Sequence, residues 1–180
     1  ASLDVIAFAG TALIDDLVLA RTGKSFDQDG HLAAKGRVDT AILAKLLSHD
    51  FFDQTPPKSL DRNAFDTSLL EKLSLEDAAA TLVAFTTAAI ARSATYFPEQ
   101  VNQWLVTGGG RHNPTIMKDL SERLGTVVQP VESVGWNGDA IEAQAFAFMA
   151  VRSLLKLPLS FPATTGVSEP ITGGILHHPK

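Results

Sequence analysis

The segment from Val106 to Pro114, VTGGGRHNP, combines the residue types most capable of chemistry in this sequence. Its three glycines, 108–110, let a backbone turn sharply and let a ligand approach without obstruction by a Cβ atom. Asn113 suits a helix N-cap and Pro114 the first helical position, so free amide groups would face the turn. Such a turn can hold the phosphates of a nucleotide, or its sugar and base. A plain structural turn is the equally valid alternative.

Two pairs of acidic residues are further candidates. Asp139 and Glu142 are three residues apart, so they share a face near the start of a predicted helix at about 137–156. There Asp139 would complement the helix dipole, and Glu142 would be a solvated or paired carboxylate. Asp15 and Asp16 are adjacent, and adjacent helical residues diverge by about 100°. We therefore expect helix-start electrostatics from this pair and not a shared metal ion.

The remaining candidates have weaker patterns. Lys58 and Ser59 follow a proline pair, where the lysine could neutralise a phosphate or have a structural role in lobe packing. His177 and His178 lack the i,i+4 spacing of a helical metal pair, which favours an exposed tail. The side chains of Arg111 and His112 are not expected to be the main ligand contacts of the glycine turn. Core packing is the expectation for the large aromatic residues Trp104, Trp136, Phe146 and Phe148.

The elements that must position these residues alternate between strands and helices. Predicted strands are at 3–8, 104–106 and 126–128, and predicted helices at 12–20, 39–47, 75–96, 115–124 and 137–156. Gly23 to Gly36 is predicted to be a polar loop. Asp39 is a plausible N-cap, and Ser74 with Asp77 resembles a capping box. The alternation predicts an α/β layer architecture in one domain covering residues 1–180.

Composition narrows the function further. The net charge of −5 argues against binding to nucleic acid or to an anionic membrane. The absence of cysteine excludes disulfides, thiolate metal sites and a cysteine nucleophile. No apolar stretch approaches the roughly 20 residues that span a bilayer, and no signal-peptide pattern opens the sequence. We expect a cytoplasmic protein with no membrane partner.

Four blocks in order give the sequence a family resemblance: AF…ALIDDLV (7–18), PPKSL-R--F (56–65), VTGGGRHNPTIM (106–117) and GDAIEAQAFAFMA (138–150). Together they resemble the anhydro-N-acetylmuramic acid kinases of bacterial cell-wall recycling. The resemblance covers essentially the whole sequence. It implies an α/β fold, the C-terminal lobe of the actin-like ATPase (ribonuclease H-like) fold, with a mixed sheet flanked by helices.

The resemblance also implies an activity. Such enzymes open the 1,6-anhydro bond of their sugar with water and phosphorylate O6, using ATP and Mg²⁺. It assigns adenosine contacts to Gly108, Gly109, Gly110 and Asn113, and a sugar or catalytic-water contact to Glu142. It assigns no protein side chain to a metal. The implied partners are the small sugar substrate and an N-terminal lobe outside this sequence, with a homodimer left open.

The catalytic block departs from the family. Family members have Asp-Thr-Gly-Pro after Ala-Phe, and that aspartate activates the water, whereas here Ala9 follows Phe8 directly. Either the protein lacks this base, or four residues are absent from this sequence alone; the intact flanks favour the second alternative. The family's N-terminal phosphate loop also has no counterpart here. The 180-residue chain by itself is therefore expected to show little or no kinase activity.

Two other functions remain open. A lobe that truly lacks the aspartate would be a non-catalytic module that holds a nucleotide or a protein partner. A kinase of the same fold could instead act on another sugar or an acyl group. For an isolated kinase lobe, the surface normally turned toward the second lobe is expected to be unusually apolar or to carry unsatisfied polar groups, and to promote association.

Overall fold

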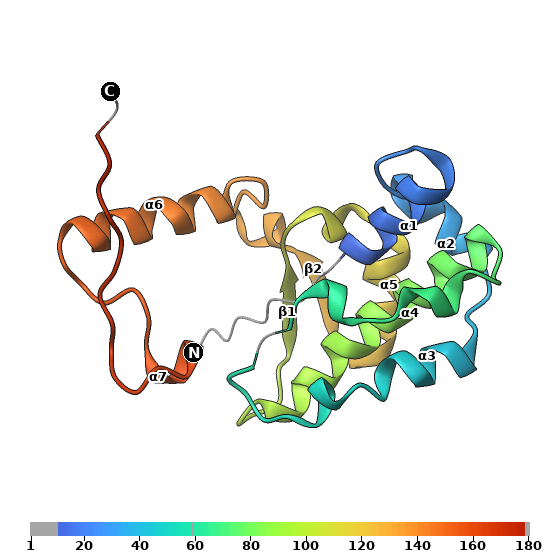
Figure 1. Ribbon diagram of the computed structural model, residues 1–180, viewed down its shortest axis with the longest axis horizontal. Helices are drawn as coiled ribbons and strands as arrows, with labels where there is room; N and C mark the ends of the chain where they lie inside the picture. The colour runs from blue at the N-terminus through green and yellow to red at the C-terminus, as the bar shows by residue number, and fades with distance from the viewer. Residues whose placement is uncertain (1–10, 59, 179–180) are drawn as a thin grey trace.

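A computed structural model of the chain describes residues 11–58 and 60–178 (Figure 1). Its helices and strands, in chain order, are α1 (Ala12–Thr22), α2 (His31–Lys35), α3 (Thr40–Leu47), α4 (Leu75–Ser93), β1 (Gln103–Val106), α5 (Pro114–Leu124), β2 (Val127–Pro130), α6 (Ile141–Leu154) and α7 (Pro162–Thr165). Short 3₁₀ helices connect them, among which η1 (Gln28–Gly30), η6 (Gly109–His112) and η7 (Val131–Val134) matter for the site. The predicted strand 3–8 and the junction of Phe8 with Ala9 lie outside the described residues.

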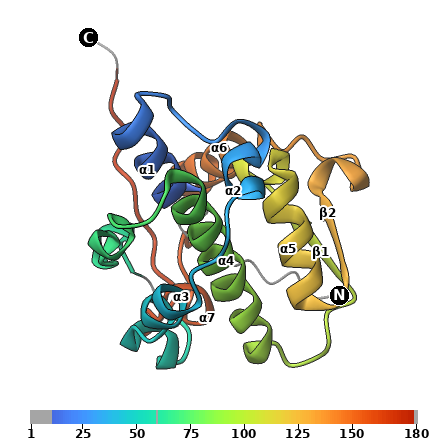
Figure 2. The same cartoon turned by 90° about the vertical axis from the view of Figure 1, so that its right-hand side faces the viewer.

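Helix α4 is the centre of the core. Its residues 78–89 are all buried, and α1, α2, α3 and α5 pack around it (Figure 2). Many of these residues are alanine, which lets neighbouring helices approach closely on every side. A helix that is apolar all round is typical of a buried position.

The same helix corrects one prediction from the sequence. Within the described part of the chain, Leu75–Tyr96 is one helix long and apolar enough to cross a membrane by length and composition. The expectation that no stretch reaches that length was therefore wrong. However, 67% of its most apolar window is buried inside the protein. Such burial is typical of the core helix of a globular protein. The length and composition of this helix are therefore weak evidence that it spans a membrane.

The sheet of the described residues has two parallel strands. Strands β1 and β2 pair in register from Gln103 opposite Val127 to Val106 opposite Pro130. Helix α5 connects them, as a parallel pair requires. This arrangement confirms an α/β fold with helices flanking a small sheet, but the described sheet is parallel and not mixed.

The predicted helix starts are largely confirmed. The side chain of Asp39 accepts from the backbone N–H groups of the first turn of α3, and Ser74 accepts from Asp77 N at 3.0 Å. Helix α6, in contrast, begins at Ile141, four residues later than predicted. The predicted loop 23–36 contains η1 and α2, because the Asp27 carboxylate accepts from two backbone N–H groups at the start of α2.

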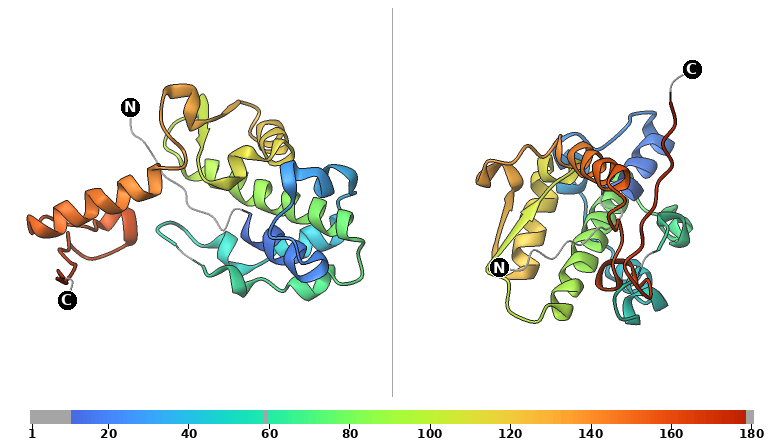
Figure 3. Two further views of the ribbon diagram at one scale, coloured as in Figure 1. Left: turned by 90° about the horizontal axis from the view of Figure 1, so that it is seen from above. Right: turned by 90° about the vertical axis from the view of Figure 1, so that its left-hand side faces the viewer.

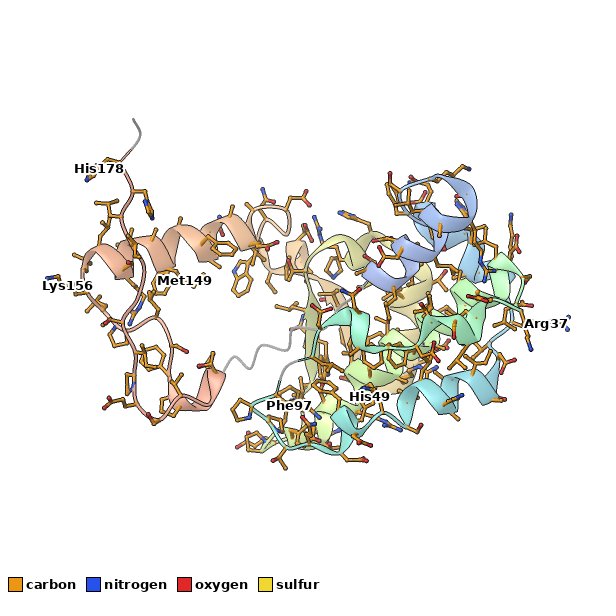
Figure 4. The ribbon with its side chains drawn as sticks, in the orientation of Figure 1. Arg37, His49, Phe97, Met149, Lys156 and His178 are labelled. Carbon is orange, nitrogen blue, oxygen red and sulfur yellow. The ribbon has the colours of Figure 1, made fainter. Side chains whose placement is uncertain are left out.

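Helix α6 and the residues after it extend away from the helical body (Figures 1 and 3). No residue of α6 is buried; Phe146 is 62% exposed and Phe148 63%. The prediction that both are core residues was wrong, as it was for the half-exposed Trp136. Trp104 is half-buried against the ring of Phe97, at 5.4 Å between centroids. Other labelled side chains of this arm, Met149, Lys156 and His178, also stand clear of the body (Figure 4).

Candidate functional site

A cavity of about 570 Å³ opens beside the glycine turn. Three segments that are distant in the sequence line it: the turn with Gly109, His112 and Asn113, the start of α1 with Thr11, Ile14 and Asp15, and the loop 25–29. The last segment is fastened to the first, because Thr115 Oγ1 donates to Gly30 O at 3.1 Å. The cavity is therefore bounded by parts of the fold that are held against one another.

The three glycines of the turn have different structural needs. Gly108 has φ 74°, a left-handed conformation that favours glycine. At Gly110 a Cβ atom would make an ordinary contact with Thr11 Cγ2, at 3.7 Å. At Gly109 the backbone needs no positive φ, and a Cβ atom would meet no atom of residues 11–58 or 60–178 within 4 Å. The folded chain thus does not itself require glycine at 109, a position that lines the open cavity.

Asn113 joins the turn to α5 and to the loop opposite. Its Oδ1 accepts from Thr115 N at 3.0 Å and Ile116 N at 3.1 Å, which confirms the predicted N-cap. The side chain is buried, and it lies so close to Gly30 that a Cβ atom there would overlap Asn113 Oδ1. Asn113 therefore fixes both the first turn of α5 and one wall of the cavity.

The side chain of Arg111 forms a cluster that the sequence patterns did not predict. Only 3% of this side chain is exposed. Its guanidinium donates to Glu132 Oε1 at 2.9 Å, Asp139 Oδ1 at 2.6 Å and Gly108 O at 2.9 Å. This Arg111 cluster ties the glycine turn to η7 and to the segment before α6. The only sequence signal for it was a basic residue inside a glycine turn with acidic residues further along the chain.

Gly138 completes the Arg111 cluster. Its N–H donates to Glu132 Oε1 at 3.1 Å, and Thr107 Oγ1 donates to its carbonyl oxygen at 3.2 Å. A Cβ atom at this position would lie 2.5 Å from Arg111 Nε. A side chain here would displace the guanidinium from its three hydrogen bonds, so the close approach favours glycine.

The ionisation of the cluster follows from these contacts. The hydrogen bond from Arg111 lowers the pKa of Asp139 below its usual range. The pKa of Glu132 is also lowered, first by its own backbone N–H and then by Arg111 and Gly138 N. The bond to Asp139 raises the pKa of Arg111. All three groups are therefore charged at neutral pH, and Asp139 acts as an ion-pair partner before the helix starts and not as a residue of its first turn.

The two adjacent aspartates of α1 face different surroundings, as predicted. Asp15 lines the cavity at the glycine turn and accepts from Thr11 Oγ1 at 2.9 Å. Asp16 lines a second cavity of about 660 Å³, which also contains Arg21 and Asp66. Among the described residues, no group of three or more histidine, cysteine, aspartate or glutamate side chains could hold a metal ion.

Glu142 is not brought to the glycine turn. It lies exposed in the first turn of α6 and lines neither of the two cavities. The Arg111 cluster nevertheless connects the turn with the residues just before Ile141. The structure thus places Gly109 and Asn113 together at one cavity, Gly108 and Gly110 beside them, and Glu142 on the arm that begins near the Arg111 cluster.

The side chain of Lys58 is held by contacts with its own loop and with Tyr96. Its Nζ donates to the backbone oxygens of Phe51 at 2.9 Å and Gln54 at 2.8 Å, and it lies over the rings of Phe51 and Tyr96. Through these contacts the lysine supports its own loop. Ser59 lies outside the described residues. His177 and His178 are exposed in the tail, as predicted.

Comparison with known proteins identifies the family. The sequence model of the anhydro-N-acetylmuramic acid kinase family matches residues 4–179. The chain belongs to this family. It is similar to proteins named anhydro-N-acetylmuramic acid kinase from Paramagnetospirillum magneticum (54% identical over 173 residues, 94% of this chain and 49% of the relative) and from Rhodospirillum rubrum (54% over 165 residues, 92% and 44%). A relative of the same name from Caulobacter vibrioides is 49% identical over 174 residues, 95% of this chain and 47% of its own.

The chain spans about half the length of these anhydro-N-acetylmuramic acid kinases. The relatives therefore contain a further region of similar size that has no counterpart among the 180 residues. Any activity named for the relatives belongs to proteins with both regions.

Proposed function

We propose that this chain is the nucleotide-binding lobe of an ATP-dependent kinase that opens 1,6-anhydro-N-acetylmuramic acid and phosphorylates O6, giving N-acetylmuramic acid 6-phosphate. The lobe would be the C-terminal one of an actin-like fold. Membership of the family supports the reaction. Gly109 is the observation that carries the nucleotide site, because a glycine that the folded chain does not require lines an open cavity. A ligand that approaches the backbone closely would explain why glycine occupies position 109.

The residues of the cavity fit an adenine nucleotide. Its volume of about 570 Å³ lies in the usual range for small-molecule sites. Gly108, Gly109 and Gly110 would contact the nucleoside through their backbone, and Asn113 would hold the turn in place. Mg²⁺ usually binds through substrate phosphates, water and one or two carboxylates. ATP would therefore bring the ion, and Asp15 is the carboxylate of this cavity nearest the start of α1. When bound, Mg²⁺ would neutralise charge on the transferring phosphoryl group.

Binding and opening the sugar would require residues beyond those of this chain. Glu142 would contact the sugar or the attacking water, and the exposed arm on which it lies would meet the second lobe. The apolar side chains on that arm support a contact of this kind, and they would also suit a homodimer. The chain alone would turn over little or no sugar, because half of the relatives' length is outside it.

Titration calorimetry with Mg²⁺ and ATP on this chain and its Gly109→Leu variant tests the nucleotide site. The new side chain would enter the cavity, and its Cβ atom would meet no atom of the described residues within 4 Å, so we expect a loss of affinity of about tenfold or more with a melting temperature close to that of the wild type. Gly173→Leu is the matched control, because its Cβ atom would meet only Leu159 Cδ1 at 3.6 Å. Equal ATP affinity in the wild type and Gly109→Leu would overturn the proposed site.

A further inference from the structure

We infer that the loop Ser25–Asp29 forms the nucleobase and ribose end of this cavity, with Phe26 as the surface on which the base stacks. The inference rests on the proposed nucleotide site. Phe26 lines the same cavity as Gly109, and it is 52% exposed although it is a large aromatic side chain. An aromatic ring left open at the wall of a pocket can bind the flat, apolar face of a base.

The loop presents this ring from a fixed backbone. The next residue, Asp27, is buried, and its carboxylate accepts from Leu32 N at 2.9 Å and from Ala33 N at 3.1 Å. On the far side of the loop, Gly30 is held by Thr115 and packs against Asn113. Phe26 is therefore exposed directly beside a segment, 27–30, that hydrogen bonds hold in place.

The charged residues of the cavity indicate the orientation of the bound nucleotide. Asp15, Asp27 and Asp29 line it, whereas no lysine or arginine among the described residues does so. A triphosphate would be repelled by the acidic loop that holds Asp27 and Asp29, and Coulomb repulsion between like charges is strong in a partly enclosed site. Ribose hydroxyls, in contrast, can donate to a carboxylate, and Asp29 belongs to this loop. The nucleoside end therefore faces Phe26 and Asp29, and the phosphates lie toward Thr11 at the start of α1, where Mg²⁺ carried by ATP would offset the charge of Asp15.

The orientation predicts which ligands depend on Phe26. If the base stacks on this ring, then adenosine, ADP and ATP all lose the same contact when the ring is removed. Base stacking on an aromatic side chain typically changes affinity by about tenfold or more. A ring that touched only the phosphates would affect ATP more than adenosine.

The test measures the affinity of the 180-residue chain for adenosine, MgADP and MgATP by calorimetry, in the wild type and Phe26→Ala. We expect a loss of about tenfold for all three ligands. Phe148→Ala is the control, since Phe148 is exposed to a similar extent, 63%, but lies on α6; it should bind like the wild type. Equal binding by Phe26→Ala and the wild type overturns the inference and leaves the proposed nucleotide site intact. Failure of the wild type to bind ATP overturns both.

A second variant covers the case in which Phe26→Ala does not fold. Phe26→Trp keeps an aromatic ring and adds a fluorophore at the cavity, so its emission, compared with that of the wild type, should be quenched by adenosine and by MgATP. An emission that does not respond to saturating ligand, measured with a chain that binds ATP, overturns the inference.

Discussion

Replacement of Asn113 by alanine should destabilise the chain by a predictable amount. The variant removes the oxygen that accepts from Thr115 N and Ile116 N, at 3.0 and 3.1 Å. Loss of an N-cap costs about 0.5–2 kcal/mol. Because Ile116 is buried, its N–H group would lose its hydrogen-bond partner at a site without water. We therefore expect a loss of stability in the upper part of this range, about 1–2 kcal/mol. For a chain of this size that corresponds to a fall of about 2–8 °C in melting temperature.

Urea denaturation and thermal unfolding measure this change, and Asn113→Asp is the matched control. Aspartate keeps an accepting oxygen in the same place and adds negative charge at the start of α5, so its stability should stay within about 0.5 kcal/mol of the wild type. Wild-type stability in Asn113→Ala would refute the capping role. A loss in Asn113→Asp as large as that in Asn113→Ala would show that the accepting oxygen is not what stabilises the turn.

Three further predictions concern the Arg111 cluster and the exposed arm. Gly138→Ala should lower the melting temperature and speed amide exchange in 108–112, because its Cβ atom would lie 2.5 Å from Arg111 Nε; unchanged exchange would argue against close approach. Arg111 lowers the pKa of Asp139, so this ion pair should stabilise the fold fully above about pH 4 and lose its effect as the pH falls through the lowered value. Stability measured from pH 6 to 3 should therefore fall less steeply in Asp139→Asn, and identical slopes would count against the pair. Phe146→Ser should reduce self-association of the chain in light scattering, since this ring is 62% exposed; undiminished association would exclude α6 as the contact surface.

Local chemistry explains which parts of the fold could be predicted from the sequence. The starts of α3, α4 and α5 are set by Asp39, Ser74 and Asn113, whose side chains accept from backbone groups two or three residues away. Such interactions are visible as short patterns. The strand and turn before α5 are equally local, so the glycine turn was placed correctly.

The parts that could not be predicted depend on long-range packing. Nothing near Arg111 in the sequence shows that it pairs with Glu132 and Asp139, 21 and 28 residues away. The contact between Thr115 and Gly30 spans 85 residues, so the loop 25–29 could not be assigned to the cavity. Phe146 was assigned to the core because apolar residues usually are, whereas its burial depends on what lies beside α6.

Amide hydrogen exchange of the chain, with and without saturating Mg²⁺ and ATP, tests the nucleotide site at the glycine turn most sharply. A nucleotide in the cavity should slow exchange in 108–113, in the loop 25–29 and at the start of α1, and should leave α3 and the tail after Leu157 unchanged. Protection restricted to other segments, or no protection at ligand concentrations that saturate calorimetric binding, would contradict a nucleotide site at the glycine turn.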